Sequence, residues 1–341
     1  MSGEALYQAG CAGCHGARGE GAPETSTGFD RPSTFPDFSD CAGTTPELDV
    51  DWRATITQGG HGRGFSRIMP SFSEELTSEQ VDLLIKYLRT LCHDARYPRG
   101  ELNLPRPLRT EKAFPESEAV MTMATTSEPA FGADAEVGYE HRLSARNQLE
   151  IALPFSSIPD ETSGRASGIG DAAFGYKRVL FASHDTIVSG QGEIVLPTGN
   201  SDRELGSGVT TFGAFASVGQ ILPSASFVQF QIGTDQPAST EKAPRTLFWR
   251  LAAGRSFRQE AGVGRLWTPM LELVSDRDFS ESARTNLDVV PQFQVTLSRR
   301  QHVRANVGLE MPATNREGRS TQLVFYLLWD WFDGGFTDGW K

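Results

Sequence analysis

From about residue 119 to about residue 332, apolar and polar side chains alternate along the chain. In one segment, Ala133, Ala135, Val137 and Tyr139 alternate with Asp134, Glu136, Gly138 and Glu140. Successive side chains of a β-strand point to opposite faces, so this period of two indicates strands with one apolar and one polar face. We count about twelve such segments, each near the ~10 residues of a membrane-spanning strand. This part of the chain is therefore expected to be all-β and antiparallel.

The alternation does not say which face points inward, because a soluble sandwich with an apolar core shows the same pattern. The connections favour a membrane barrel, since short turns on one rim and long loops on the other are typical of outer-membrane barrels. The short turns are at 144–147, 183–185, 223–226 and 298–301, and the long loops are at 156–167, 198–208, 234–245, 275–286 and 312–320. An even number of strands would return both barrel ends to the periplasmic rim.

Residues 1–93 have a different, helical pattern. Thr77 and Gln80 form a predicted capping box, which marks the start of a helix that ends near Leu91. The apolar residues Val81, Leu84, Ile85, Leu88 and Leu91 then fall on one face of this helix. We therefore expect a small, separate helical domain at the amino-terminal end.

Residues 94–117 join the two parts. Pro98, Pro105, Pro107 and Pro115 stand among charged residues in this stretch. Proline at this density favours an extended, semi-rigid connection. The predicted organisation is thus a helical domain over 1–93, a linker over 94–117 and a barrel over 118–341.

The sequence Cys11-Ala12-Gly13-Cys14-His15 is the attachment motif of c-type haem. The two thiols can each form a thioether to a haem vinyl group, and His15 is then placed to coordinate the iron. We expect one covalent haem c, and its sixth ligand must come from elsewhere. Met69, on a loop before the predicted helix, is the first candidate, although a methionine can also simply fill a core. His61 is the rival, or else it faces solvent or contacts a haem propionate.

Two cysteines, Cys41 and Cys92, lie outside this motif. Haem is attached outside the cytoplasm, where disulfides persist, so we expect them to form a disulfide; two buried free thiols are the alternative. Export needs a leader, and Met1 runs directly into the first predicted helix. We infer that a signal peptide was removed.

The net charge and the motifs that are absent argue against two classes of function. A net charge of −11 argues against a nucleic-acid partner. Neither an H-E-x-x-H nor a G-x-S-x-G motif is present, so nothing points to hydrolytic chemistry.

Two stretches of the chain resemble known families. Leu6-Tyr7 before the haem motif, Met69-Pro70 and the final amphipathic helix make residues 3–92 similar to a small monohaem cytochrome c, from which Cys41 and Cys92 depart. That resemblance implies His15 and Met69 as axial ligands and electron transfer as the activity. The run from Gly168 to Lys177, followed by Leu196-Pro197-Thr198-Gly199, resembles the outer-membrane barrels associated with meta-pathway phenol degradation. Together the halves resemble the iron-oxidising outer-membrane cytochrome–porin fusions.

This architecture implies electron transfer at or across the bacterial outer membrane. The haem domain is too large to enter about twelve strands completely, so we expect it to cap or partly plug the barrel, on the periplasmic side or in the lumen. The expected partners are a periplasmic electron carrier, membrane lipid, and extracellular Fe(II) or another external redox partner. With Fe(II), the protein would act as an Fe(II) oxidase.

The alternative functions are a haem-gated or redox-sensing channel and a periplasmic cytochrome anchored by its barrel. Charged residues on the polar strand face would touch the haem domain or line water: Asp134, Glu136, Glu150, Arg250, Arg304 and Glu310.

Overall fold

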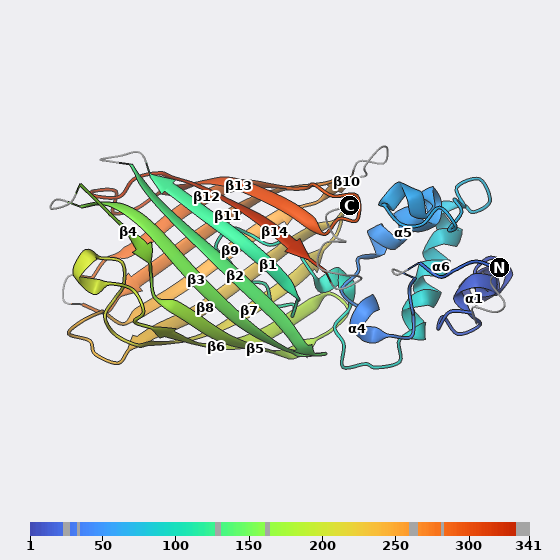
Figure 1. Cartoon of the computed structure of the whole chain (residues 1–341), viewed down its shortest axis with the longest axis horizontal. Helices are drawn as coiled ribbons and strands as arrows, with labels where there is room; N and C mark the ends of the chain where they lie inside the picture. Colours follow the sequence, from blue (N-terminus) through green and yellow to red (C-terminus); the bar gives the residue numbers. More distant parts are fainter. Residues whose placement is uncertain are drawn as a thin grey trace.

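The structure is a computed structural model, and it describes residues 1–22, 28–32, 35–126, 131–160, 164–258, 265–280 and 283–331. A small helical region and a β-barrel lie end to end along the long axis of the molecule (Figure 1). The predicted fold class, a small helical region followed by an antiparallel barrel of twelve strands, is confirmed. The end of the predicted barrel domain, residues 332–341, lies outside the described residues.

The helical region is built on two helices that pack against each other. Helix α6 starts at the predicted capping box of Thr77 and Gln80, and its apolar face packs on Leu6 and Tyr7 of α1. Among the described residues, no helix has both the length and the apolar character that a membrane crossing requires. The helical elements are α1 (Gly3–Gly10), α2 (Ala12–His15), α4 (Cys41–Thr44), α5 (Asp49–Gln58), α6 (Ser78–Leu91) and the 3-10 helices η1 (Gly60–Arg63) and η2 (Gly100–Leu102).

Twelve antiparallel strands close into a ring, in which β1 pairs with β14 and β9 pairs with β11. The short strand β4 pairs with β3, and β10 pairs with β11. The strands are β1 (Glu118–Thr126), β2 (Gly132–Ser144), β3 (Asn147–Asp160), β4 (Gly164–Ile169), β5 (Ala172–Ala182), β6 (Thr186–Leu196), β7 (Thr211–Leu222), β8 (Ser226–Pro237), β9 (Thr246–Arg255), β10 (Phe257–Arg258), β11 (Leu266–Asp278), β12 (Thr285–Thr296), β13 (Val303–Pro312) and β14 (Gln322–Asp330). Closure gives every strand of the ring a partner on both sides.

The apolar face of the barrel points outward. On β3, Leu149 and Leu153 are 46% and 50% exposed, whereas the neighbouring Gln148 is fully buried. Polar side chains are buried inside the ring on other strands as well, and these include Glu140, Lys177, Gln191, Gln229, Glu272, Gln292 and Asn306. A soluble sandwich would bury its apolar face, so this orientation rules out the alternative that the alternation had left open.

Residues 103–116 of the linker lie inside the barrel, and we call them the luminal segment. Their backbone is held by side chains from strands all around the ring. The contacts are Gln229 Nε2 to Pro105 O (2.7 Å), Tyr326 Oη to Arg106 O (2.6 Å), Leu108 N to Gln292 Oε1 (3.0 Å), Arg109 N to Glu272 Oε2 (3.2 Å), Glu111 N to Gln231 Oε1 (3.2 Å) and Glu116 N to Gln148 Oε1 (2.7 Å). The proline content had suggested only a connecting strap, so this insertion was not foreseen.

The luminal segment is basic where it faces acidic strands. The Arg106 guanidinium pairs with Glu118 at 2.8 Å and with Glu140 at 2.5 Å. Of the charged residues expected on the inner face, Glu310 pairs with the luminal segment and Arg250 donates to its backbone, whereas Arg304 lies 3.6 Å from Asp330 of the barrel itself. Two of these six residues, Glu310 and Arg250, therefore contact the linker, where contact with the helical region or with water was expected.

The helical region sits at the rim that carries the short turns. The turn between β12 and β13 contacts the end of η1 and the residue after it: Arg300 Nη2 donates to Gly64 O at 3.1 Å, and Arg63 Nη1 donates to Arg299 O at 3.4 Å. The long β6–β7 connection, which contains η3 (Ser201–Arg203), lies at the opposite end of the barrel (Figure 1).

Candidate haem site

The C-x-x-C-H motif is held at the junction of α1 and α2. Tyr7, which is fully buried, donates from its hydroxyl to Gly16 O at 2.7 Å. Gly16 adopts a φ of 77°, a left-handed conformation that glycine allows without strain, and this turns the chain out of α2. Gly21 N then donates to His15 O at 2.7 Å. These bonds set the two thiols and the imidazole on one short turn of helix.

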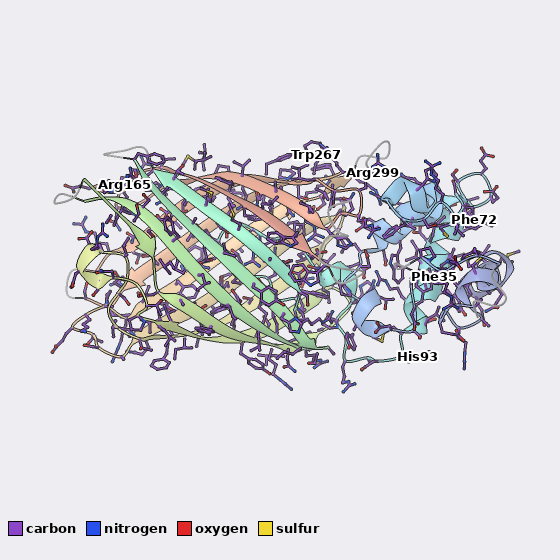
Figure 2. All side chains as sticks on the ribbon, viewed as in Figure 1. Phe35, Phe72, His93, Arg165, Trp267 and Arg299 are labelled. Atoms are coloured by element: carbon purple, nitrogen blue, oxygen red, sulfur yellow. A yellow bond between two sulfur atoms is a disulfide. The ribbon has the colours of Figure 1, made fainter. Side chains whose placement is uncertain are left out.

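Cys11, Cys14 and His15 share a cavity of about 450 Å³ with Met69. This volume is in the range of cofactor pockets. Its wall is largely aromatic and apolar, with Phe29, Phe35, Phe38, Trp52, Ile56, Phe65, Ile68, Phe72 and Leu88. Figure 2 shows Phe35 and Phe72 within the helical region, away from the barrel. The structure thus brings together the four residues that the sequence assigned to the haem.

His15 is prepared to act as a ligand. Its ring stacks on Phe35, with 5.0 Å between centroids, and meets Phe38 at 5.2 Å. Burial lowers the pKa of His15 to about 4, so the imidazole is neutral at pH 7 and keeps a lone pair for a metal. Its Nδ1 is buried without a hydrogen-bond partner among the described residues. Cys11 and Cys14 are free thiols, so the site fits a covalent c-type haem.

The two candidates for the sixth ligand occupy different places. Met69 lines the cavity, on a loop that is held by Gly60 N donating to Met69 O at 3.1 Å. A Cβ on Gly60 would lie 2.2 Å from Ser66 O, so only glycine permits this close packing. His61 is exposed on η1 and does not line the cavity. The geometry therefore favours Met69.

A disulfide ties the middle of the helical region to the end of α6. Cys41 and Cys92 are bonded, with Cα atoms 5.2 Å apart and a sequence separation of 51 residues. Arg89 of α6 braces the same area, since its Nε donates to Asp49 at 2.8 Å and its Nη1 to Thr44 O at 2.9 Å. The guanidinium also lies 4.0 Å over the Trp52 ring, which forms part of the cavity wall.

Two residues of the barrel complete the cavity wall. Arg300 and Gln301, in the β12–β13 turn, line the same space as the haem motif. Sequence reasoning missed them, because nothing in a short turn almost three hundred residues after the motif marks it as part of that site. Only the docking of the two parts brings them there.

Comparison with known proteins gives one family match, over residues 1–92, and several structural similarities. Residues 1–92 match the model of the cytochrome c family. Among solved structures, the chain is similar to the KdgM porin (8% identity, TM-score 0.42, covering 63% of this chain and 99% of that one) and to an outer membrane channel from Pseudomonas putida F1 (13% identity, TM-score 0.42, covering 66% and 99%). It is also similar to the beta domain of the Bordetella autotransporter BrkA (13% identity, TM-score 0.41, covering 63% and 99%). No curated protein matches the chain.

Proposed function

We propose that this chain transfers electrons at the bacterial outer membrane through one covalent haem c, held where the helical region meets the barrel. The match to the cytochrome c family implies electron transfer with covalent haem. The observation that carries the proposal is the cavity that joins Cys11, Cys14, His15 and Met69 to a turn of the barrel. The haem supplies one-electron chemistry when it is bound.

The residues of the cavity have separate roles in this proposal. The thiols of Cys11 and Cys14 anchor the haem, and the neutral imidazole of His15 coordinates the iron. Met69, which lines the same cavity, would supply the second side-chain ligand, and a thioether ligand raises the reduction potential. The aromatic wall, with Phe35, Phe38 and Trp52, keeps water from the iron.

The barrel supports the outer-membrane location. Each of the twelve strands of the ring has a partner on both sides, and the exposed face of the ring is apolar, as lipid requires. Short turns of such barrels face the periplasm. The helical region, which docks on that rim through Arg300 and Gly64, would then face a periplasmic electron carrier.

The luminal segment helps to decide between electron transfer and a redox-gated channel. A redox-gated channel needs an open path, yet residues 103–116 are bonded to strands on several sides of the lumen. We therefore favour electron transfer over solute passage. A periplasmic cytochrome that is merely anchored by its barrel shares all these features and differs only in having no partner on the far side.

Exchange with extracellular Fe(II) is the further-reaching form of the proposal. It is suggested by the resemblance to iron-oxidising cytochrome–porin fusions, and it requires electrons to cross the lumen from the long-loop rim. The test uses the full chain with its haem in liposomes of known orientation. Haem reduction by Fe(II) supplied only on the long-loop side would support this form. If Fe(II) reduces the haem only when it is supplied on the side of the helical region, the protein would instead be a periplasmic cytochrome anchored by its barrel.

Production of the chain with haem-maturation enzymes tests the core of the proposal. We expect the membrane fraction to contain the protein with covalent haem, one per chain, as measured by the pyridine haemochrome spectrum and intact mass. Cys14→Ala should keep only one thioether, which moves the α-band of that spectrum to longer wavelength. Protein that inserts into the membrane without covalent haem would overturn the proposal.

A further inference from the structure

We propose that Arg300, a residue of the barrel, binds a propionate of the haem and thereby sets the haem potential from the barrel side. This inference rests on the proposed function, because it assumes that the cavity holds a c-type haem. It assigns to the β12–β13 turn a role in binding the cofactor in addition to docking.

Arg300 is buried where the barrel meets the helical region, and two of its side-chain nitrogens have no hydrogen-bond partner among the described residues. Its side chain is only 7% exposed, and it lines the cavity that contains Cys11, Cys14 and His15. Its Nη2 donates to Gly64 O at 3.1 Å, whereas Nε and Nη1 are buried and have no hydrogen-bond partner among the described residues. A buried cationic group with unmet donors is costly, so an anion is needed beside it.

Within the part of the chain that the structure describes, no carboxylate accepts from Nε or Nη1 of Arg300. The carboxylates of Asp37, Asp40, Glu47 and Asp51 line the same cavity. Neither Nε nor Nη1 of Arg300 donates to any of them in the described structure. The propionates are the anionic groups of a haem, and the guanidinium fork matches a carboxylate in shape and charge.

The guanidinium is also held in position before the haem arrives. Its Cζ lies 4.7 Å from the centroid of the Phe65 ring, a cation–π contact that fixes its plane. Gly64 holds one nitrogen from the same loop. A second guanidinium, that of Arg63, lines the cavity beside it and donates to Arg299 O at 3.4 Å. The cavity wall therefore holds two guanidinium groups from the junction of the helical region and the barrel.

The reduction potential of the haem should depend on the contact between Arg300 and the propionate. A cation near the propionate disfavours the extra positive charge of the ferric iron, so its removal should favour Fe(III). We expect Arg300→Gln to raise the ferric to ferrous ratio at a fixed potential roughly tenfold, which is a downward shift of about 59 mV for a one-electron couple. Arg300→Lys keeps the charge and should restore most of the potential.

The control is Arg299→Gln, because Arg299 is an exposed arginine in the same turn. Its backbone oxygen, which Arg63 contacts, remains in that variant. The measurement is a spectroelectrochemical titration of the full chain in detergent, on samples with equal covalent haem. A potential that changes as much in Arg299→Gln as in Arg300→Gln, or in neither, would overturn the assignment. Absence of covalent haem from the unsubstituted chain would instead be a failure of the proposed function.

Discussion

Arg109 of the linker and Glu310 of strand β13 form an ion pair inside the barrel, with 2.5 Å between Nη2 and Oε2. The two residues are 201 positions apart in the chain. This pair and the Arg106 cluster show that the linker is a bound part of the barrel rather than a free tether. The helical region is consequently held at the rim from two sides, by the luminal segment and by the β12–β13 turn.

Loosening the luminal segment should open the barrel. Arg106 pairs with the carboxylates of Glu111, Glu118 and Glu140. Its loss would leave Glu118 and Glu140 with only the more distant Lys112 and Lys177 ammonium groups, at 3.5 and 3.7 Å. Breaking such a buried pair typically costs about 3–5 kcal/mol. We expect the Arg106→Gln and Arg109→Gln double variant to admit small ions and solutes, measured as liposome conductance.

Arg178→Gln is the matched control, since Arg178 is an exposed arginine on a barrel strand. It should conduct no better than the unsubstituted chain. If the unsubstituted chain already conducts as well as the double variant, the luminal segment does not close the barrel.

The twelve-strand barrel could be predicted because alternation and loop lengths are local properties of the sequence. The haem motif could be assigned for the same reason, since Cys11, Cys14 and His15 lie within five residues. The outward direction of the apolar face could be predicted only from the loop lengths, because the alternation is the same for both directions; the exposed Leu149 and Leu153 and the buried Gln148 confirm it. The luminal segment and Arg300 were beyond sequence reasoning, as each depends on contacts between residues far apart in the chain.

The identity of the sixth ligand can be tested by substitution. Met69→Ala should abolish the methionine–iron charge-transfer band near the red end of the spectrum. It should also lower the reduction potential, because axial ligands set haem potentials over a range of about 0.8 V. His61→Ala should leave both unchanged, since His61 is exposed and does not line the cavity. A charge-transfer band that persists in Met69→Ala would show that another residue is the ligand.

Removing the disulfide should weaken the helical region. The bond between Cys41 and Cys92 spans 51 residues, and closing a loop of that length is worth about 4 kcal/mol in the chain-entropy model. We expect the Cys41→Ser and Cys92→Ser double variant to lose about 2–4 kcal/mol of stability. Urea unfolding followed by the haem Soret band measures this directly. An unchanged midpoint with an unchanged slope would contradict the prediction.

Asp49 should give the helical region a specific pH dependence. Burial, together with the nearby Glu101 carboxylate, raises the pKa of Asp49 to about 6, despite Arg89. The unfolded value is about 3.9, so between these values the folded state binds more protons. The contribution of Asp49 to the free energy of unfolding is therefore fully present below about pH 4 and is lost as the pH rises through about 6.

The Asp49 side chain is 38% exposed, so solvent screening limits the effect to about 1 kcal/mol. Urea unfolding of Asp49→Asn and of the unsubstituted chain, at pH 4 and pH 7, isolates this contribution. The difference in stability between the two proteins should change by about that amount between the two pH values. The same difference at both values would mean that the pKa of Asp49 is not raised.

The most direct test of haem at the short-turn rim is its reduction from one side of a membrane. The full chain is placed in liposomes, and proteolysis of the helical region establishes which side that region faces. A membrane-impermeant one-electron reductant is then supplied on that side, and the haem spectrum is followed by stopped flow. We predict rapid conversion to the ferrous spectrum; haem that stays ferric under these conditions would contradict the proposed electron transfer at the membrane.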